Sequence, residues 1–246
     1  MVVGRGAPCM ITVSAHPGAI VVGEQVLVSG PEGHHLMVRR VEDMVELRVV
    51  DGAGTVGWGR LGLRGKLAAV TIERVERVPA PAPMVLAVGA GDRERFVDLV
   101  EKAVELGVTR VVPLDTAHSL SVANRLRAKH REKLERRAQE AIKQSGNPWL
   151  PEISDPVPLE RFLAGELPSH RWLADLAGGP PGPVAPDGGV TVAVGPEGGF
   201  TAGERSALLA AGFTPAKLGP HVLRFDTAAL AALTMAWQAR QRNRHD

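Results

Sequence analysis

Cysteine and aromatic residues are scarce in this sequence. Among its 246 residues there is one cysteine, Cys9, and no tyrosine, with four tryptophans and five phenylalanines. A single cysteine excludes an internal disulfide framework and cannot supply a cysteine-rich zinc site, so we expect a reducing compartment. The aromatic side chains are too few to build a stacking platform for nucleic-acid bases on their own.

Long apolar segments are absent as well. The first residues are interrupted by Gly4, Gly6 and Pro8 and do not resemble a signal peptide. No apolar run approaches the length that a membrane-spanning helix needs. We therefore expect a cytoplasmic protein with no membrane partner.

Motifs of metal sites and hydrolases are also missing. His34 and His35 stand in tandem, but no cysteine, histidine or acidic residue lies at ligand spacing from them, so we expect no metal. No Gly-x-Ser-x-Gly elbow is present, which leaves a hydrolase unsupported.

Charge is nearly balanced overall but unevenly distributed. The formal net charge is +2 and the sequence pI is about 9.0. Basic residues cluster in one segment with a helical pattern and again near the C-terminus. Such clusters suit the phosphate backbone of a nucleic acid, and a solvated helix face is the alternative. The residues are Arg125, Arg127, Lys129, Arg131, Lys133, Arg136, Arg137, Lys143, Arg240, Arg242 and Arg244.

A proline-rich segment at 79–83 divides the chain into two parts. Its prolines at alternate positions favour an extended linker. Residues 1–78 contain short strand-like segments separated by glycines, which predict a small β-barrel. These segments are 19–22, 25–28, 45–50, 56–63 and 66–75.

Residues 84–246 alternate between strand and helix patterns. Such alternation predicts an α/β domain with a mainly parallel sheet covered on both faces. Asp92 is placed to cap one helix, which ends at Gly107, and Gly146 is placed to end the basic helix. The expected strands are 84–88, 110–114, 171–174, 191–194 and 215–218, and the last two helices are 201–211 and 226–241.

Two glycine-bearing loops near the C-terminus are the most informative feature. The first reads GPEGGF at 195–200, and the second reads LGPHVLRFDTA at 218–228. Each follows a predicted strand and precedes a predicted helix, so both should open at the same edge of one sheet and form a pocket. Because glycine lacks a Cβ, its backbone can approach a ligand closely. Neither loop has the lysine of a P-loop or the spacing of a dinucleotide fingerprint, which disfavours nucleoside triphosphates and NAD.

These two loops resemble the SPOUT class of S-adenosylmethionine-dependent RNA methyltransferases, and within it the 16S rRNA uracil-N3 methyltransferase family. Further similar stretches span most of the chain: 91–108, 144–153, His34 to Leu36, and Asp51 with Gly52. The resemblance implies a C-terminal domain with a deep trefoil knot, an N-terminal PUA-like or OB-like barrel that binds RNA, and a homodimer. It also implies S-adenosyl-L-methionine as cofactor and 16S rRNA of the small ribosomal subunit as partner.

The resemblance assigns site residues within this sequence. Arg224 and Glu197 are the candidate catalytic residues: Arg224 could stabilise the uracil anion or hold a phosphate, and Glu197 could act as base. An ion pair of Arg224 with Asp226 or Glu197, and a helix-capping role for Glu197, are the structural alternatives. The expected cofactor-binding residues are Leu173, Val194, Gly195, Pro196, Glu197, Gly198, Gly199, Leu218, Gly219, Leu223, Thr227 and Ala228. The expected RNA-binding residues are His35, Arg40, Arg93, Arg125, Arg127, Gln144 and Ser145.

The sequence also departs from the family pattern. Lys143 and Asn147 stand where the family usually has glutamate and arginine, and Arg39 precedes Arg40 where it usually has leucine. The RNA contacts, or the residue that acts as general base, can therefore differ from those of the family. Two other functions stay open: a related SPOUT enzyme that methylates a ribose 2′-hydroxyl or another base, and a non-catalytic RNA-binding assembly factor.

Overall fold

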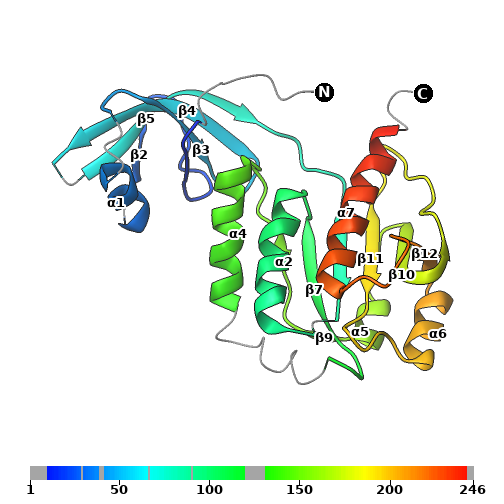
Figure 1. Ribbon diagram of the computed structural model, residues 1–246. Coiled ribbons are helices and arrows are strands. Elements are labelled where there is room, and N and C mark those ends of the chain that lie inside the picture. Colours follow the sequence, from blue (N-terminus) through cyan, green and yellow to red (C-terminus); the bar gives the residue numbers. More distant parts are fainter. Residues whose placement is uncertain are drawn as a thin grey trace. The chain divides into compact units, whose positions relative to one another are not determined.

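The computed structural model describes residues 10–28, 30–38, 42–65, 67–89, 91–119 and 131–242. It divides into two compact units (Figure 1). The first comprises the chain up to Ala80 together with Ala141–Leu150, and the second comprises Pro81–Glu140 and the chain from Pro151 onward. The change of unit at Ala80 falls inside the proline-rich segment, whereas the return of residues 141–150 to the first unit has no signal in the sequence.

The first unit is built on a mostly antiparallel sheet. Its strands are ordered β1-β3-β4-β5-β2, and only β1 and β3 pair in parallel. One face of the sheet packs on a core that includes Leu47, Leu61, Val70 and Ile72. The elements are β1 (Thr12–Ser14), β2 (Gln25–Val28), α1 (Gly30–Val38), β3 (Glu46–Val50), β4 (Thr55–Arg64) and β5 (Leu67–Arg77).

Most predicted strands of this unit are present, but the strand predicted at 19–22 is wrong. There the chain makes turns, with Ala19 N–H bonded to the His16 carbonyl and Glu24 N–H bonded to the Val21 carbonyl. Only Ile20 is buried in this segment, because positive φ angles of +83° at Gly18 and +86° at Gly23 bend the chain on both sides of it. The short strand β1 and the glycine-rich helix α1 were not predicted.

The second unit is an α/β fold with a parallel sheet, as predicted. The strand order is β12-β10-β11-β6-β7-β8, β9 also pairs with β7, and every pair is parallel. The strands are β6 (Met84–Val88), β7 (Arg110–Asp115), β8 (Glu152–Ile153), β9 (Val157–Pro158), β10 (His170–Gly179), β11 (Val190–Val194) and β12 (Thr214–Ala216). The helices are α2 (Arg93–Glu105), α5 (Leu159–Leu163), α6 (Ala202–Ala210), α7 (Phe225–Arg242) and, as far as Glu140, α4 (Arg131–Ser145).

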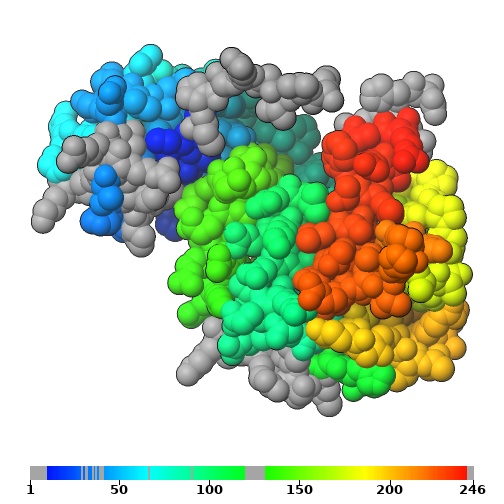
Figure 2. All heavy atoms as spheres, in the orientation of Figure 1, coloured from blue at the N-terminus to red at the C-terminus, as the bar shows by residue number. Residues whose placement is uncertain are grey.

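Helices cover both faces of this sheet. The helices α2 and α7 pack together, and α7 crosses β6 and β11 (Figure 1). In the space-filling view α7 lies at the surface beside α2 (Figure 2). On the opposite face, α5 and α6 enclose an apolar cluster with Ala87, Ala193 and Leu208. Every residue of β6 and β11 is buried, as expected for central parallel strands covered on both faces.

The predicted helix ends are confirmed. Asp92 caps α2, with its Oδ1 accepting a hydrogen bond of 2.9 Å from the Arg95 N–H. Gly107 and Gly146 follow α2 and α4 with φ angles of +79° and +72°. Thr201 caps α6 in a capping box with Glu204.

Candidate active site

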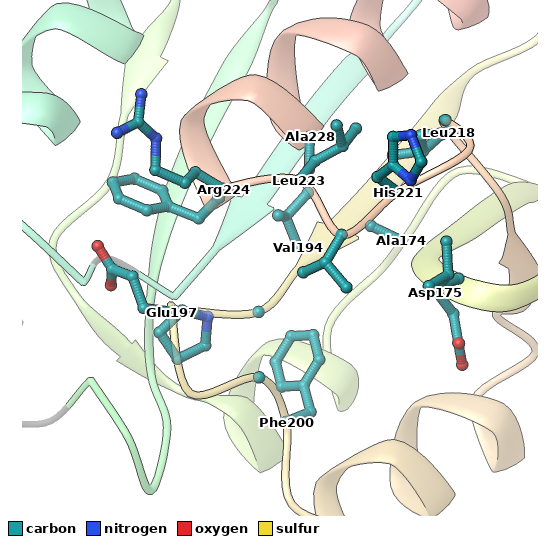
Figure 3. Close-up of a pocket in the computed structure, with 17 residues that line it drawn as sticks. Ala174, Asp175, Val194, Glu197, Phe200, Leu218, His221, Leu223, Arg224 and Ala228 are labelled. Atoms are coloured by element: carbon teal, nitrogen blue, oxygen red, sulfur yellow. The ribbon is translucent and has the colours of Figure 1, made fainter.

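A cavity of about 460 Å³ opens where β11 and β12 end, beside the middle of β10 (Figure 3). These three strands are neighbours in the sheet, with β10 in the middle. The carboxyl ends of parallel strands are the usual place for a ligand in such folds. The two predicted loops therefore do meet on one cavity, which is lined by Ala174, Asp175, Leu176, Val194, Gly195, Pro196, Glu197, Gly199, Phe200, Leu218, Gly219, His221, Val222, Leu223, Arg224, Phe225 and Ala228.

The first loop is a tight turn that favours glycine at two positions. The Gly199 N–H donates to the Pro196 carbonyl at 2.8 Å, and Gly199 has a φ of +68°. A Cβ on Gly195 would lie 3.1 Å from both the Gly199 Cα and the Phe200 N. The glycines therefore bring backbone to the cavity wall, as the sequence predicted.

The second loop offers polar backbone groups beside apolar side chains. In the part of the chain that the structure describes, no group accepts a hydrogen bond from the N–H of Leu218, Gly219 or Leu223. Leu218, Leu223 and Val222 supply apolar surface along the same loop. Such a lining suits a ligand that has both an apolar body and hydrogen-bond acceptors.

Neighbouring loops hold the first loop in place. A Cβ on Gly89 would lie 2.6 Å from the ring of Pro196, and one on Gly91 would collide with the Glu197 carboxylate. The chain after β7 contributes His118, whose Nδ1 lies 3.0 Å from the Gly199 carbonyl oxygen. The chain after β6 and the chain after β7 thus both pack against the GPEGGF turn.

The Glu204 carboxylate links the chain after β7 to the start of α6. Its Oε1 accepts from the Ala117 N–H at 2.8 Å, and its Oε2 accepts from the Thr201 N–H at 2.8 Å. Burial raises the pKa of Glu204, but these hydrogen bonds and nearby His118 outweigh burial and lower the pKa below its ordinary value. The carboxylate is therefore held in its charged form.

Arg224 and Glu197 lie on the same side of the cavity (Figure 3). The Arg224 side chain is 63% exposed, and its Nε lies 3.9 Å from Asp226 Oδ1. That oxygen also accepts from the Thr227 N–H at 2.9 Å. Of the two ion pairs considered for Arg224, the structure contains the one with Asp226, at a distance that leaves the guanidinium available to a ligand.

Three of the predicted cofactor residues lie outside the cavity lining. Leu173 is buried in the apolar cluster between the sheet and α6. Gly198 faces His118, since a Cβ there would lie 2.9 Å from the imidazole ring. Thr227 is exposed on the first turn of α7. The remaining predicted residues, Val194, Gly195, Pro196, Glu197, Gly199, Leu218, Gly219, Leu223 and Ala228, line it.

The middle strand β10 supplies cavity residues that were not predicted. Asp175 accepts from Arg205 Nε at 2.8 Å and from the Ala177 N–H at 2.9 Å. Burial raises the pKa of Asp175, but these two partners outweigh it and the pKa falls below its ordinary value. Knowing that β10 lies between the two loop strands would have pointed to its carboxyl end. The other unpredicted residues are Ala174, Leu176, Phe200, His221, Val222 and Phe225.

The structure describes only some of the predicted RNA-binding residues. Arg93 pairs with its neighbour Glu94 at 2.9 Å. Gln144 and Ser145 line a hollow within the first unit, not the cavity. The Ser145 Oγ donates to the Ala141 carbonyl at 2.6 Å, which fits a residue that ends its helix. The His35 side chain, Arg40, Arg125 and Arg127 lie outside the described residues.

Several basic residues of the predicted clusters have partners inside the protein. Arg131, Lys133 and Arg137 on α4 each lie 2.8 Å from a carboxylate, of Glu135, Glu94 and Glu101 respectively. These pairs favour a solvated, ion-paired helix face.

Arg240 does not belong to the basic surface that its position in the sequence suggested. It is 8% exposed and donates to the carbonyl oxygens of Gly188 and Pro83, because α7 turns this position toward the sheet. It therefore has a structural role.

Two other features of the described residues bear on function. They contain no cluster of three or more histidine, cysteine or acidic residues that could hold a metal ion. Among them no helix is long and apolar enough to cross a membrane.

Comparison with known proteins decides the family. Residues 78–237, which include every element of the cavity, match the family model of the RNA methyltransferase domain. The chain belongs to this RNA methyltransferase family.

Relatives of this RNA methyltransferase carry a more specific name. "Ribosomal RNA small subunit methyltransferase E" of Mycobacterium bovis is 30% identical, over 88% of this chain and 90% of the relative. The protein of that name from Synechocystis is 29% identical, over 87% of this chain and 73% of the relative.

Solved structures agree with this relationship. The ribosomal RNA small subunit methyltransferase E of Neisseria gonorrhoeae, bound to S-adenosyl methionine, superposes with a TM-score of 0.78 at 27% identity and covers 91% of this chain and 95% of its own. A putative methyltransferase from Legionella pneumophila, also with the bound cofactor, superposes with a TM-score of 0.75 at 25% identity, over 94% of this chain and 98% of its own.

Proposed function

We propose that this RNA methyltransferase transfers the methyl group of S-adenosyl-L-methionine to N3 of a specific uridine in 16S rRNA of the small ribosomal subunit, in the cytoplasm. One observation carries the proposal. The two loops that resemble the uracil-N3 methyltransferase family line a single cavity, in a chain whose relatives are named for small-subunit ribosomal RNA methylation.

The cavity fits this cofactor. Its volume of about 460 Å³ lies in the range of about 300 to 1,000 Å³ that small-molecule sites occupy. Leu218, Leu223 and Ala228 can enclose the adenine and methionine parts, while the N–H groups of the second loop can donate to adenine nitrogens. When bound, the cofactor supplies an electrophilic methyl group on a positively charged sulfur.

Arg224 is the residue that we propose for acceptor activation. Uracil N3 carries a proton at neutral pH, so its lone pair becomes available only when the proton leaves and charge spreads to O2 and O4. A guanidinium that lines the cavity and remains 63% exposed can donate to those oxygens. Glu197, on the same side, can accept the N3 proton or orient the cofactor.

We further propose the domain roles and the finer fold that the resemblance implies. Residues 84–246 form a SPOUT domain whose last helix α7 passes through a deep trefoil knot, which the packing of α7 against β6, β11 and α2 supports. Residues 79–83 are the linker, and residues 1–78 are a PUA-like or OB-like barrel that binds RNA.

A homodimer is part of the proposal. Val222 in the second loop is 85% exposed and Trp237 on α7 is 53% exposed. Val222 lines the cavity, and Trp237 lies on α7, whose first turn also lines it, so burial of both apolar side chains against a second copy would favour a dimer. A second copy of the chain would cover them and complete the wall of the cavity.

Analysis of modified nucleosides tests the proposed reaction. Mass spectrometry of 16S rRNA from cells that lack the gene should show the loss of one N3-methyluridine, restored by the wild-type gene. The Arg224→Ala variant should leave the site unmethylated while calorimetry shows nearly unchanged cofactor affinity. Loss of a 2′-O-methyl group would identify a related SPOUT enzyme, and unchanged rRNA together with no cofactor binding would favour the assembly factor.

A further inference from the structure

A hollow in the first unit contains no residue of the cavity already described. Its volume is about 330 Å³. Every residue that lines it belongs to the first unit. The lining consists of Met10, Thr12, Arg48, Trp58, Gln144, Ser145 and Gly146.

One wall of the hollow is a row of side chains across neighbouring strands. Thr12 on β1 pairs with Arg48 on β3, and Arg48 pairs with Trp58 on β4. Trp58 pairs in turn with Arg74 on β5, so the four side chains share one face of the sheet. The Arg74 guanidinium carbon lies 3.6 Å from the centre of the Trp58 ring, a cation–π contact that fixes the indole in place.

The Arg48 guanidinium has unused donor capacity. Its Nε is buried, and no described residue accepts a hydrogen bond from it. The guanidinium lies against the backbone of Gly146, where a Cβ would collide with it. A buried donor without a partner is unfavourable, so an acceptor that draws the guanidinium toward the hollow, which Arg48 lines, would relieve this cost.

The other wall of the hollow adds neutral polar groups. Gln144 and Ser145 are exposed there, and no acidic side chain lines the hollow. An anionic ligand therefore meets a cation and an aromatic ring without a repelling carboxylate. A phosphate group accepts from a guanidinium, and a nucleic-acid base stacks on an indole.

We infer that this hollow binds one unstacked nucleotide of the RNA substrate, with its base against Trp58 and its phosphate on the Arg48 guanidinium. The inference rests on the proposed function for the identity of the substrate as RNA. An acidic peptide would satisfy Arg48 but would leave the fixed indole unused, so single-stranded RNA fits the hollow better. Gln144 and Ser145, the two exposed residues predicted as RNA contacts, line it.

Binding of a short fluorescent single-stranded RNA to the full chain tests the inference. Arg48→Gln and Trp58→Leu should each weaken binding about tenfold, and Trp58→Phe should retain most of the affinity because it keeps a ring. Arg48→Gln should also lower the dependence of log affinity on log salt by about one unit. The matched control is Arg60→Gln, since Arg60 on β4 is already paired with Glu73 at 3.1 Å.

The outcomes separate this inference from the proposed reaction. Unchanged RNA affinity in Arg48→Gln and Trp58→Leu, or an equal loss in Arg60→Gln, would overturn it. A wild-type protein that fails to methylate 16S rRNA overturns the proposed function, whereas normal methylation with an unchanged RNA KM in the Arg48 and Trp58 variants overturns only the nucleotide site.

Cofactor affinity is measured on each variant, and should stay at the wild-type value because the cavity belongs to the other unit. If Trp58→Leu misfolds and loses cofactor affinity, the inference is tested by the RNA affinities of Arg48→Gln and Arg60→Gln alone. Tight binding of polyglutamate with the same variant sensitivity, and none of RNA, would assign the hollow to a protein partner.

Discussion

His118 Nδ1 lies 3.0 Å from the carbonyl oxygen of Gly199 and so joins the chain after β7 to the first loop of the cavity. A carbonyl oxygen can only accept, so Nδ1 carries the hydrogen. The same imidazole fills the space above Gly198, where a Cβ would lie 2.9 Å from it. The side chain of one loop therefore holds the backbone of another without lining the cavity itself.

Removal of this contact should weaken cofactor binding. His118→Ala deletes a hydrogen bond worth about 1 kcal/mol, so we expect cofactor affinity measured by calorimetry to fall about fivefold. His118→Asn, whose amide can donate near the position of Nδ1, should restore most of it. The control is His16→Ala, an exposed histidine of the first unit. Equal affinities for the wild type and His118→Ala would show that the turn is held by its own glycines.

Two glycines near the cavity should respond in opposite directions to alanine. Gly199 has a φ of +68°, and an alanine there costs about 1 to 2 kcal/mol of backbone strain. Gly203 lies in α6, where a Cβ would have no neighbouring atom within 4 Å, so alanine there should stabilise the helix by about 0.5 kcal/mol. Denaturant unfolding of the two variants measures both effects. Similar stabilities for the pair would contradict the conformational argument.

The stability that Glu204 contributes to the fold should be lost in acid. Its pKa in the folded protein is lowered below the ordinary 4.5, so the charged carboxylate stabilises the fold above that value. This stabilisation is lost as the pH falls through the lowered folded pKa. The Glu204→Gln variant should be less stable than the wild type at pH 7, and the difference should shrink below about pH 4.5. Unfolding curves at several pH values test the sign, and a constant difference across that range would refute the assignment.

Arg240 should contribute to stability and not to RNA affinity. Arg240→Ala removes the guanidinium that donates to the carbonyl oxygens of Gly188 and Pro83, at a cost of about 2 to 3 kcal/mol. Arg242→Ala, at an exposed position two residues on, should change stability by less than about 0.5 kcal/mol. RNA affinity of the folded Arg240→Ala protein should equal that of the wild type. A loss of affinity without a loss of stability would return Arg240 to the RNA surface.

Local signals in the sequence predicted the α/β part of the fold well. Buried strands such as 84–88, the cap at Asp92 and the ends at Gly107 and Gly146 depend on neighbouring residues, and each is where the sequence placed it. The strand predicted at 19–22 failed because apolar residues between two glycines satisfy the same pattern when only Ile20 is buried.

The site was predictable where it depends on glycine and less so where it depends on strand order. The turn at Gly195 and Gly199 follows from residue type alone. The contribution of Asp175 and Leu176 required knowing that β10 lies between β11 and β12, which is a long-range property. The burial of Arg240 likewise depends on the packing of α7 against distant loops. Its charge alone therefore led to the wrong prediction of a surface basic cluster.

The residues that line the cavity all fall between Ala174 and Ala228 in the chain. During synthesis, the strands β6 and β7 emerge long before any of these residues has been made. A nascent chain that ends before β11 lacks both loops and contains only the β10 part of the cavity wall. Under the proposed function, cofactor binding therefore requires both loops to have been synthesised, and a fragment that stops before the second loop should not bind the methyl donor.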